Sequence, residues 1–133
     1  MKIEHKKILL VHNNHEERGR LGIMLSRFGH EVRFTSGNGC PENLSRDNDL
    51  IIVDDKLAGQ SGIKFLKNFS NKLSGKVIYL SSVSFFADLI ELQKELQNLN
   101  IYEWVAKPVD PLKLAVIVCD FFIEAEIGNA LPV

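Results

Sequence analysis

The sequence has few cysteines, no long apolar run and almost no net charge. Cys40 and Cys119 are too few for a disulfide framework, and Cys119 stands in an apolar stretch typical of a small core residue. No apolar run reaches the roughly 18 residues that span a bilayer, and the polar start at residues 1–7 is unlike a signal peptide. Sixteen basic and seventeen acidic side chains give a net charge of -1. These absences predict a cytoplasmic domain that binds neither nucleic acid nor membrane directly.

Short apolar runs alternate with helical patterns along the whole chain of 133 residues. The runs that we predict to form strands are Ile8–Val11, Glu31–Phe34, Leu50–Val53, Lys76–Leu80 and Tyr102–Val105. Continuous apolar runs are typical of strands that are covered on both faces. Together with the helical patterns between them, they predict one α/β domain over residues 1–133, in which helices cover both faces of a parallel sheet.

Helical periodicity fills the intervals between the predicted strands. Asn14 is predicted to cap the first helix, with Glu17 as its capping-box partner and Gly29 at its end. A short second helix is predicted to open at Pro41, and a third at about Gly62. The apolar face of the first helix is predicted to comprise Leu21, Met24, Leu25 and Phe28.

The last two predicted helices are rich in apolar residues. The fourth carries a stripe at spacings of four and three, which comprises Phe85, Leu89, Leu92, Leu96 and Leu99. The last helix, capped by Asp110 and Pro111, is predicted to run into the 120s. Its main stripe is Leu112, Ala115, Val116, Cys119 and Phe122, and a second apolar set is Leu114, Ile117, Val118 and Phe121. The second set predicts either an outer face covered by a partner or a broad contact with the core.

An acidic residue follows the third predicted strand, and glycines punctuate the backbone after it. Asp54 ends the strand, with Gly59 five and Gly62 eight residues later, and Lys107-Pro108 follows the fifth strand. The carboxyl ends of parallel strands share one edge, where open α/β sheets bind their ligands. We therefore expect Asp54 and Lys107 to lie close together. A carboxylate that faces a lysine there is suited to holding a phosphoryl group.

These residues resemble the receiver domain of two-component response regulators over residues 7–122. The resemblance rests on Asp54 with its two glycines, on Ser81 at the end of the fourth strand and on Lys107-Pro108. It implies a flavodoxin-like (βα)5 three-layer sandwich with a five-stranded parallel sheet in the order 2-1-3-4-5. The glycine spacings fit Asp54 and miss Asp55 by one residue. Asp54 therefore matches the phosphoacceptor of the family.

The resemblance implies an atypical receiver in a phosphorelay, not an enzyme, that takes phosphate from a histidine kinase or a phosphotransfer protein. Asp54 would attack the donor, Lys107 would neutralise charge on the phosphoryl group, and Ser81 would donate its hydroxyl. Ser81 and Trp104 match the switch positions of the family. Without the resemblance, the alternatives are an acid that caps a loop, a solvated lysine and an ordinary turn serine.

The end of the first strand departs from the pattern of the family. The resemblance implies two adjacent acids that hold Mg²⁺ with the phosphoacceptor, but His12 and Asn13 stand there. Mg²⁺ prefers oxygen ligands, carboxylates above all. With Asp54 and Asn13 as its ligands and His12 at the degenerate position, we expect Mg²⁺ binding to be weak or absent. A softer metal held by His12, Asp54 and the nearby His15 is the alternative.

Two hypotheses for function follow from these residues. Asp54, Ser81 and Lys107 favour a receiver that accepts phosphate on Asp54 and signals by protein-protein interaction. His12 and Asn13 favour a pseudo-receiver, which uses the same fold as a protein-interaction module without phosphorylation. A flavin-binding protein of similar topology is a third alternative, but it requires a Ser/Thr/Gly-rich phosphate loop after the first strand, which this sequence lacks.

The predicted interaction surface is formed by the fourth helix, the fifth strand and the last helix. We expect it to bind a protein target or a second copy of the chain, because both helices carry extended apolar stripes. Ile117 and Phe121 are predicted to face outward on this surface. The chain is predicted to be a stand-alone receiver or a piece of a larger regulator.

Overall fold

The computed structural model describes residues 6–38, 46–69, 73–82 and 86–130. Five parallel strands form one sheet, and they are β1 (Lys7–Val11), β2 (Glu31–Thr35), β3 (Leu50–Asp54), β4 (Lys76–Ser81) and β5 (Ile101–Ala106). Each predicted strand is present and extends one or two residues further. The sheet order β2-β1-β3-β4-β5 confirms the predicted flavodoxin-like topology.

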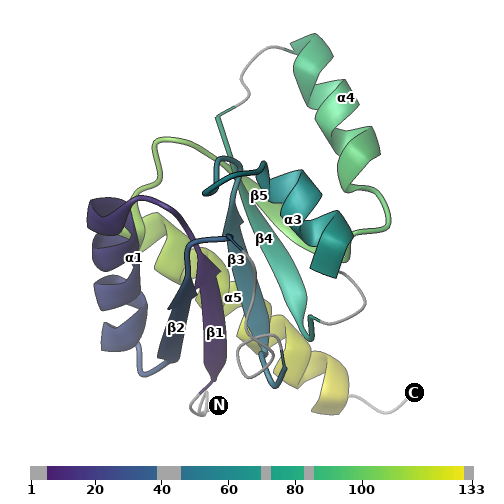
Figure 1. Ribbon diagram of the computed structural model, residues 1–133. Coiled ribbons are helices and arrows are strands. Elements are labelled where there is room, and N and C mark those ends of the chain that lie inside the picture. The colour runs from purple at the N-terminus through teal and green to yellow at the C-terminus, as the bar shows by residue number, and fades with distance from the viewer. Residues whose placement is uncertain (1–5, 39–45, 70–72, 83–85, 131–133) are drawn as a thin grey trace.

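The described helices form a layer on each face of the sheet (Figure 1). They are α1 (His15–Arg27), α3 (Gly62–Phe69), α4 (Phe86–Leu96) and α5 (Pro111–Ala130). One core cluster buries residues of α1 and α5, namely Leu21, Leu25, Leu114 and Val118. The cluster on the opposite face buries residues of α3 and α4, namely Phe65, Leu66, Leu92 and Leu96. The short helix predicted from Pro41 lies outside the described residues, as does Phe85.

The adjacent strands β1 and β3 are held in place by burial on both faces. β1 and β3 pair side by side, and every residue of β3 is buried. Ile8 and Leu10 contribute to the core on one face, while Leu9 and Val11 contribute to the core on the other. This burial on both faces is what continuous apolar runs predict. The carboxyl ends of both strands are thereby held by core packing on both sides.

The start of α1 differs in one respect from the predicted capping box. Asn14 Oδ1 accepts the backbone N–H of Glu17 at 2.9 Å, so Asn14 is the N-cap. In a capping box, the side chain of Glu17 would accept the backbone N–H of Asn14. Here that N–H donates to His12 Nδ1 at 3.1 Å instead. The carboxylate of Glu17 instead accepts a bond from Arg20 at 2.6 Å. The end of α1 also differs, since Phe28 follows the last helical residue and is exposed.

The prediction for the outer face of α5 is wrong. Its buried residues are Leu114, Ala115, Val118 and Phe122. Ile117 and Phe121, predicted to face outward, are partly buried and pack against this core. The large apolar residues of α5 that face solvent are Leu112, Val116, Ile123 and Ile127, and Cys119 is half-buried rather than part of the core. Because α5 carries apolar residues on several sides near its start, periodicity alone could not show which side the sheet covers.

The apolar stripe of α4 is used mainly within the domain. Leu92 and Leu96 are buried against the sheet, and Leu99 packs against the same cluster. Ile90 is exposed on another side of the helix. Within the described residues, no helix has the length and apolar character needed to cross a membrane.

Candidate functional site

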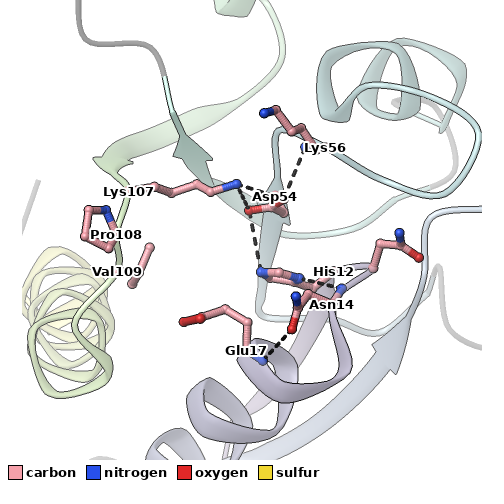
Figure 2. Close-up of a pocket in the computed structure, with 9 residues that line it drawn as sticks. His12, Asn14, Glu17, Asp54, Lys56, Lys107, Pro108 and Val109 are labelled. Atoms are coloured by element: carbon pink, nitrogen blue, oxygen red, sulfur yellow. Dashed lines mark hydrogen bonds and ion pairs between the residues drawn. The ribbon is translucent and has the colours of Figure 1, made fainter.

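A cavity of about 570 Å³ opens at the carboxyl edge of the sheet. It lies where β1, β3 and β5 end and where α1 begins, and Figure 2 shows the side chains that converge there. The lining residues are His12, Asn13, Asn14, Glu17, Asp54, Lys56, Lys107, Pro108 and Val109. The cavity therefore combines segments that are distant in sequence and includes four of the predicted site residues.

Asp54 and Lys107 form the centre of this cavity. Asp54 is the last residue of β3, and only 2% of its surface is exposed. Lys107 follows β5, and its Nζ lies 2.9 Å from Asp54 Oδ1 and 3.2 Å from Oδ2. The backbone N–H of Lys56 donates to Asp54 Oδ2 at 3.1 Å. The carboxylate is thus buried, and both of its oxygens face nitrogen donors.

The two glycines after Asp54 have a steric role in the loop that leads to α3. A side chain at Gly62 would collide with the backbone carbonyl oxygen of Asp54. Gly59 has a φ of 77°, a conformation that side chains with a Cβ disfavour. The spacing that singles out Asp54 in the sequence therefore reflects a tight turn that brings α3 back against the end of β3.

Asp55 also binds Lys107, a role that the sequence did not predict. Its Oδ1 lies 2.8 Å from Lys107 Nζ, and its Oδ2 accepts bonds from Ser82 N at 2.8 Å and Ser82 Oγ at 2.6 Å. Burial opposes ionisation of Asp55, but the bonds from Lys107 and Ser82 outweigh it and hold the pKa of Asp55 below its usual value. The presence of two consecutive acids after the third strand was the only feature of the sequence that could have indicated a second carboxylate beside Lys107.

The charge of Lys107 is stabilised by both carboxylates. Burial disfavours its ammonium form, but the hydrogen bonds to Asp55 and Asp54 reverse that effect and raise the pKa of Lys107 above its ordinary value. The lysine is therefore fully charged at neutral pH. An ammonium group at this edge of the sheet is also able to bind an incoming anion.

His12 closes the β1 side of the cavity. Only 4% of its surface is exposed, and its Nε2 lies 3.5 Å from Asp54 Oδ1. Since Nδ1 accepts the backbone N–H of Asn14, a neutral ring carries its proton on Nε2, toward Asp54. Burial lowers the pKa of His12 although the charge of Asp54 opposes this shift. His12 is therefore a neutral N–H donor at physiological pH.

The residues of the cavity do not fit a Mg²⁺ ion. Both oxygens of Asp54 contact Lys107, and Glu17, the other carboxylate in the lining, accepts a bond from Arg20. His12 offers an N–H, which cannot bind a metal. Across the described part of the chain, no group of three or more His, Cys, Asp or Glu side chains could hold a metal ion. His15, the third member of the alternative site for a softer metal, is not part of the cavity lining.

The structure places Ser81 and Trp104 away from this cavity lining. Ser81 ends β4 and is buried, and its backbone oxygen accepts the N–H of Lys107 at 2.8 Å. It borders a neighbouring cavity together with Asp55. Trp104 is exposed and lines a groove beside Ile90 of α4. The site as described thus joins Asp54, Lys107 and His12, while Trp104 belongs to a different surface.

No protein-family model matches this sequence, and no curated protein matches it either. Solved structures, by contrast, do match this chain. A receiver domain protein from Methanospirillum hungatei JF-1 aligns with a TM-score of 0.74 at 22% identity, over 94% of this chain and 99% of that chain. The chain has the fold of a response regulator receiver domain. The receiver domain of a Luxo repressor protein from Vibrio parahaemolyticus aligns with a TM-score of 0.75 at 18% identity, over 94% and 95% of the two chains.

Receiver domains from other kinds of signalling protein also share this fold. That of a signal transduction histidine kinase from Syntrophus aciditrophicus aligns with a TM-score of 0.73 at 19% identity, over 96% of this chain and 98% of that chain. The receiver fold is therefore common to this chain and to domains found in regulators and kinases. At such low identity, the likeness concerns the fold, and function has to be argued from the site.

Proposed function

We propose that this chain is an atypical receiver domain that accepts a phosphoryl group on Asp54 and signals by binding other proteins. The observation that carries the proposal is the contact of 2.9 Å between Asp54 Oδ1 and Lys107 Nζ at the edge of a cavity. A nearly buried carboxylate beside a lysine, in a cleft at the ligand-binding edge of the sheet, is a candidate functional site. The donor would be a histidine kinase or a phosphotransfer protein.

The proposed reaction is a displacement at phosphorus. An oxygen of Asp54 attacks the phosphorus of a phosphohistidine or an acyl phosphate, and a new oxygen–phosphorus bond forms. The bond to the imidazole or acyl oxygen breaks, and that group leaves with the electron pair. Lys107 then turns from the carboxylate to the phosphoryl oxygens, and Lys56, in the same lining, adds positive charge. The charge added to the cavity is therefore met by cations of the chain itself.

A pseudo-receiver is the alternative function, and the β1 side of the cavity favours it. His12 and Asn13 leave the cavity without the carboxylates that would bind a divalent cation. In this alternative, Asp54 and Lys107 form a permanent ion pair that supports the fold, and the domain works by protein-protein interaction alone. The groove between α4 and β5, about 540 Å³ and lined by Ile90 and Trp104, is the surface that we propose for a protein target.

Mass measurement of the intact protein distinguishes these two functions. The protein would be incubated with acetyl phosphate or phosphoramidate, with and without Mg²⁺. We expect one phosphate adduct on the wild type and none on Asp54→Asn. The matched control is Asp55→Asn, which alters the neighbouring acid and the same lysine contact, and it should keep the adduct. An adduct that persists in Asp54→Asn would contradict the proposed acceptor, and a wild type that takes no phosphate would support the pseudo-receiver.

A further inference from the structure

An apolar seam runs along the solvent side of α5. It consists of Leu112, Val116, Cys119 and Ile123, at successive spacings of four, three and four. These are the spacings of the two core positions in a coiled-coil heptad. Leu112 is 52% exposed, Val116 48% and Ile123 37%. Among the described residues, the seam is therefore an exposed surface without a covering element, and its pattern is that of a helix-helix contact.

Other apolar residues of α5 pack within the domain. Phe122 packs against His30, which lies just beyond α1, with ring centroids 5.2 Å apart. Phe121 packs against Tyr102 of β5, with centroids 4.8 Å apart. The outer seam lies on the side of α5 that these contacts leave open. It is thus distinct from the groove between α4 and β5.

We propose that α5 pairs with α5 of a second copy of this chain, in antiparallel orientation, through the outer seam. In the register that the heptad spacing requires, Leu112 lies opposite Ile123 of the second copy, and Val116 lies opposite Cys119. Each contact occurs twice, because a two-fold axis crosses the middle of the seam. The assembly is closed at two copies.

The charged residues beside the seam favour a second copy of the chain as its partner, with the two helices antiparallel. Lys113 and Asp120 are both exposed, lie seven residues apart and flank the same side of the seam. In the antiparallel register, Lys113 of each copy lies opposite Asp120 of the other, which gives two ion pairs. A parallel pair would give neither residue an opposite charge. The surface is therefore complementary to itself in one orientation only, as a contact between identical copies requires.

The first test exchanges these charges. Sedimentation velocity would follow association of the wild type up to about 1 mM, because short interfaces are weak. Lys113→Asp and Asp120→Lys each replace two attractions by two repulsions, so each should weaken the dimer about tenfold. The double variant restores opposite charges and should recover association. A wild type that stays monomeric, or a double variant no better than the single variants, would overturn the proposal.

The second test traps the register by a disulfide. In a Cys40→Ser background, Val116→Cys places a thiol opposite Cys119 of the second copy. A mild oxidant such as diamide should then give a covalent dimer whose peptides join positions 116 and 119. Trapping of two Cys119 side chains without the substitution would indicate a parallel pair and overturn the antiparallel register.

A matched variant distinguishes the outer seam from the other candidate surface. Leu112→Glu charges the seam, whereas Ile90→Glu charges another exposed apolar position, on α4. Circular dichroism should show that both variants fold, since neither residue belongs to the core. We expect only Leu112→Glu to abolish association. Loss of association in Ile90→Glu alone would assign the contact to the groove between α4 and β5 instead.

Discussion

The two sides of the Asp54 cavity differ in the chemistry they present. On the side of β3 and β5, a buried carboxylate faces an ammonium group at 2.9 Å. On the side of β1, an imidazole N–H and an amide occupy the positions where the receiver pattern leads us to expect acids. The first side carries the charges on which the proposed phosphoryl transfer depends, and the second lacks the carboxylates that Mg²⁺ prefers. The two sides of one cavity in a receiver fold can therefore differ in charge while the strands beneath them stay the same.

The sheet explains why the positions of the cavity residues do not depend on the chemistry of their side chains. β1 and β3 are adjacent and in register, with Val11 opposite Val53. The next residues, His12 and Asp54, must therefore meet at the sheet edge whatever their side chains are. Packing of the apolar strands fixes the geometry of the cavity, while residues just beyond them determine its charge. A substitution there can change the ligand with little cost to the fold.

Restoring the acids on the β1 side should have the largest effect. In the variant His12→Asp with Asn13→Asp, three carboxylates would surround one point. We expect its affinity for Mg²⁺ to exceed that of the wild type by about 100-fold or more, since charge count governs such sites. Calorimetric titration of both proteins would measure this difference.

A control for this prediction places an acid nearby but outside the cavity lining. His15→Asp adds a charge on the first turn of α1 and should leave the affinity for Mg²⁺ close to that of the wild type. Binding of Mg²⁺ by the wild type at concentrations well below about 1 mM would contradict the expected weakness of its site. Glu17, released from Arg20, would then be the first ligand to examine.

Removal of the lysine charge should have the next largest effect, on the opposite side of the cavity. Lys107→Met keeps the length of the side chain but deletes the ammonium group that contacts Asp54. If Asp54 is phosphorylated, the rate of adduct formation should fall about 100-fold, as when one donor to a transition state is lost. The time course of the intact mass with acetyl phosphate would give this rate.

Lys56→Met is the matched control for Lys107→Met. Lys56 also lines the cavity, but it is its backbone N–H, not its ammonium group, that donates to Asp54. We expect a much smaller decrease in the rate for this variant. Equal decreases in both variants would show that overall positive charge matters and that the specific contact with Lys107 does not.

The pH dependence of stability tests the buried imidazole. Burial lowers the pKa of His12, so an unfolded chain binds a proton below about pH 6.5 that the folded chain resists. The free energy of unfolding should therefore fall as the pH decreases below about 6.5, by at most about 1.4 kcal/mol per pH unit for this group. Above that pH the ring is neutral in both states and contributes no slope.

Urea unfolding between pH 7.5 and pH 5.5 would measure this slope. His12→Gln removes the titrating ring and should show a flatter profile than the wild type. The matched variant His15→Gln replaces an exposed ring on α1 and leaves the buried ring of His12 in place. A His12→Gln profile that matches the wild type would mean that His12 titrates normally in the folded state.

The strands and the meeting of Asp54 with Lys107 were accessible from the sequence because they depend on local patterns, whereas the strand order followed only from the resemblance to receiver domains. Apolar runs mark the strands, and the residues that end parallel strands share an edge whatever lies between them. The glycine spacings identified Asp54 because steric contact at Gly62 requires them. Features that follow from adjacent residues and from sheet topology can thus be predicted.

The features that could not be predicted depend on which of several similar side chains the tertiary structure buries or bonds. Around α5, apolar residues occupy several sides, so periodicity could not tell Val118, which is buried, from Val116, which is exposed. The bond from Asn14 N to His12 replaced the predicted capping box, because an imidazole happens to end β1. Such outcomes depend on tertiary contacts that a one-dimensional pattern does not contain.

The smallest effect that we predict concerns the acid beside the proposed acceptor. Ser82 Oγ donates to Asp55 Oδ2 at 2.6 Å, and this bond links the end of β3 to the end of β4. Ser82→Ala keeps the backbone donor but removes the hydroxyl, so the free energy of unfolding should decrease by about 1 kcal/mol. Urea unfolding would measure this decrease, and the phosphate adduct on Asp54 should form at an unchanged rate. A slower adduct with unchanged stability would contradict this assignment, because Asp55 would then act in the chemistry of the cavity and not in its support.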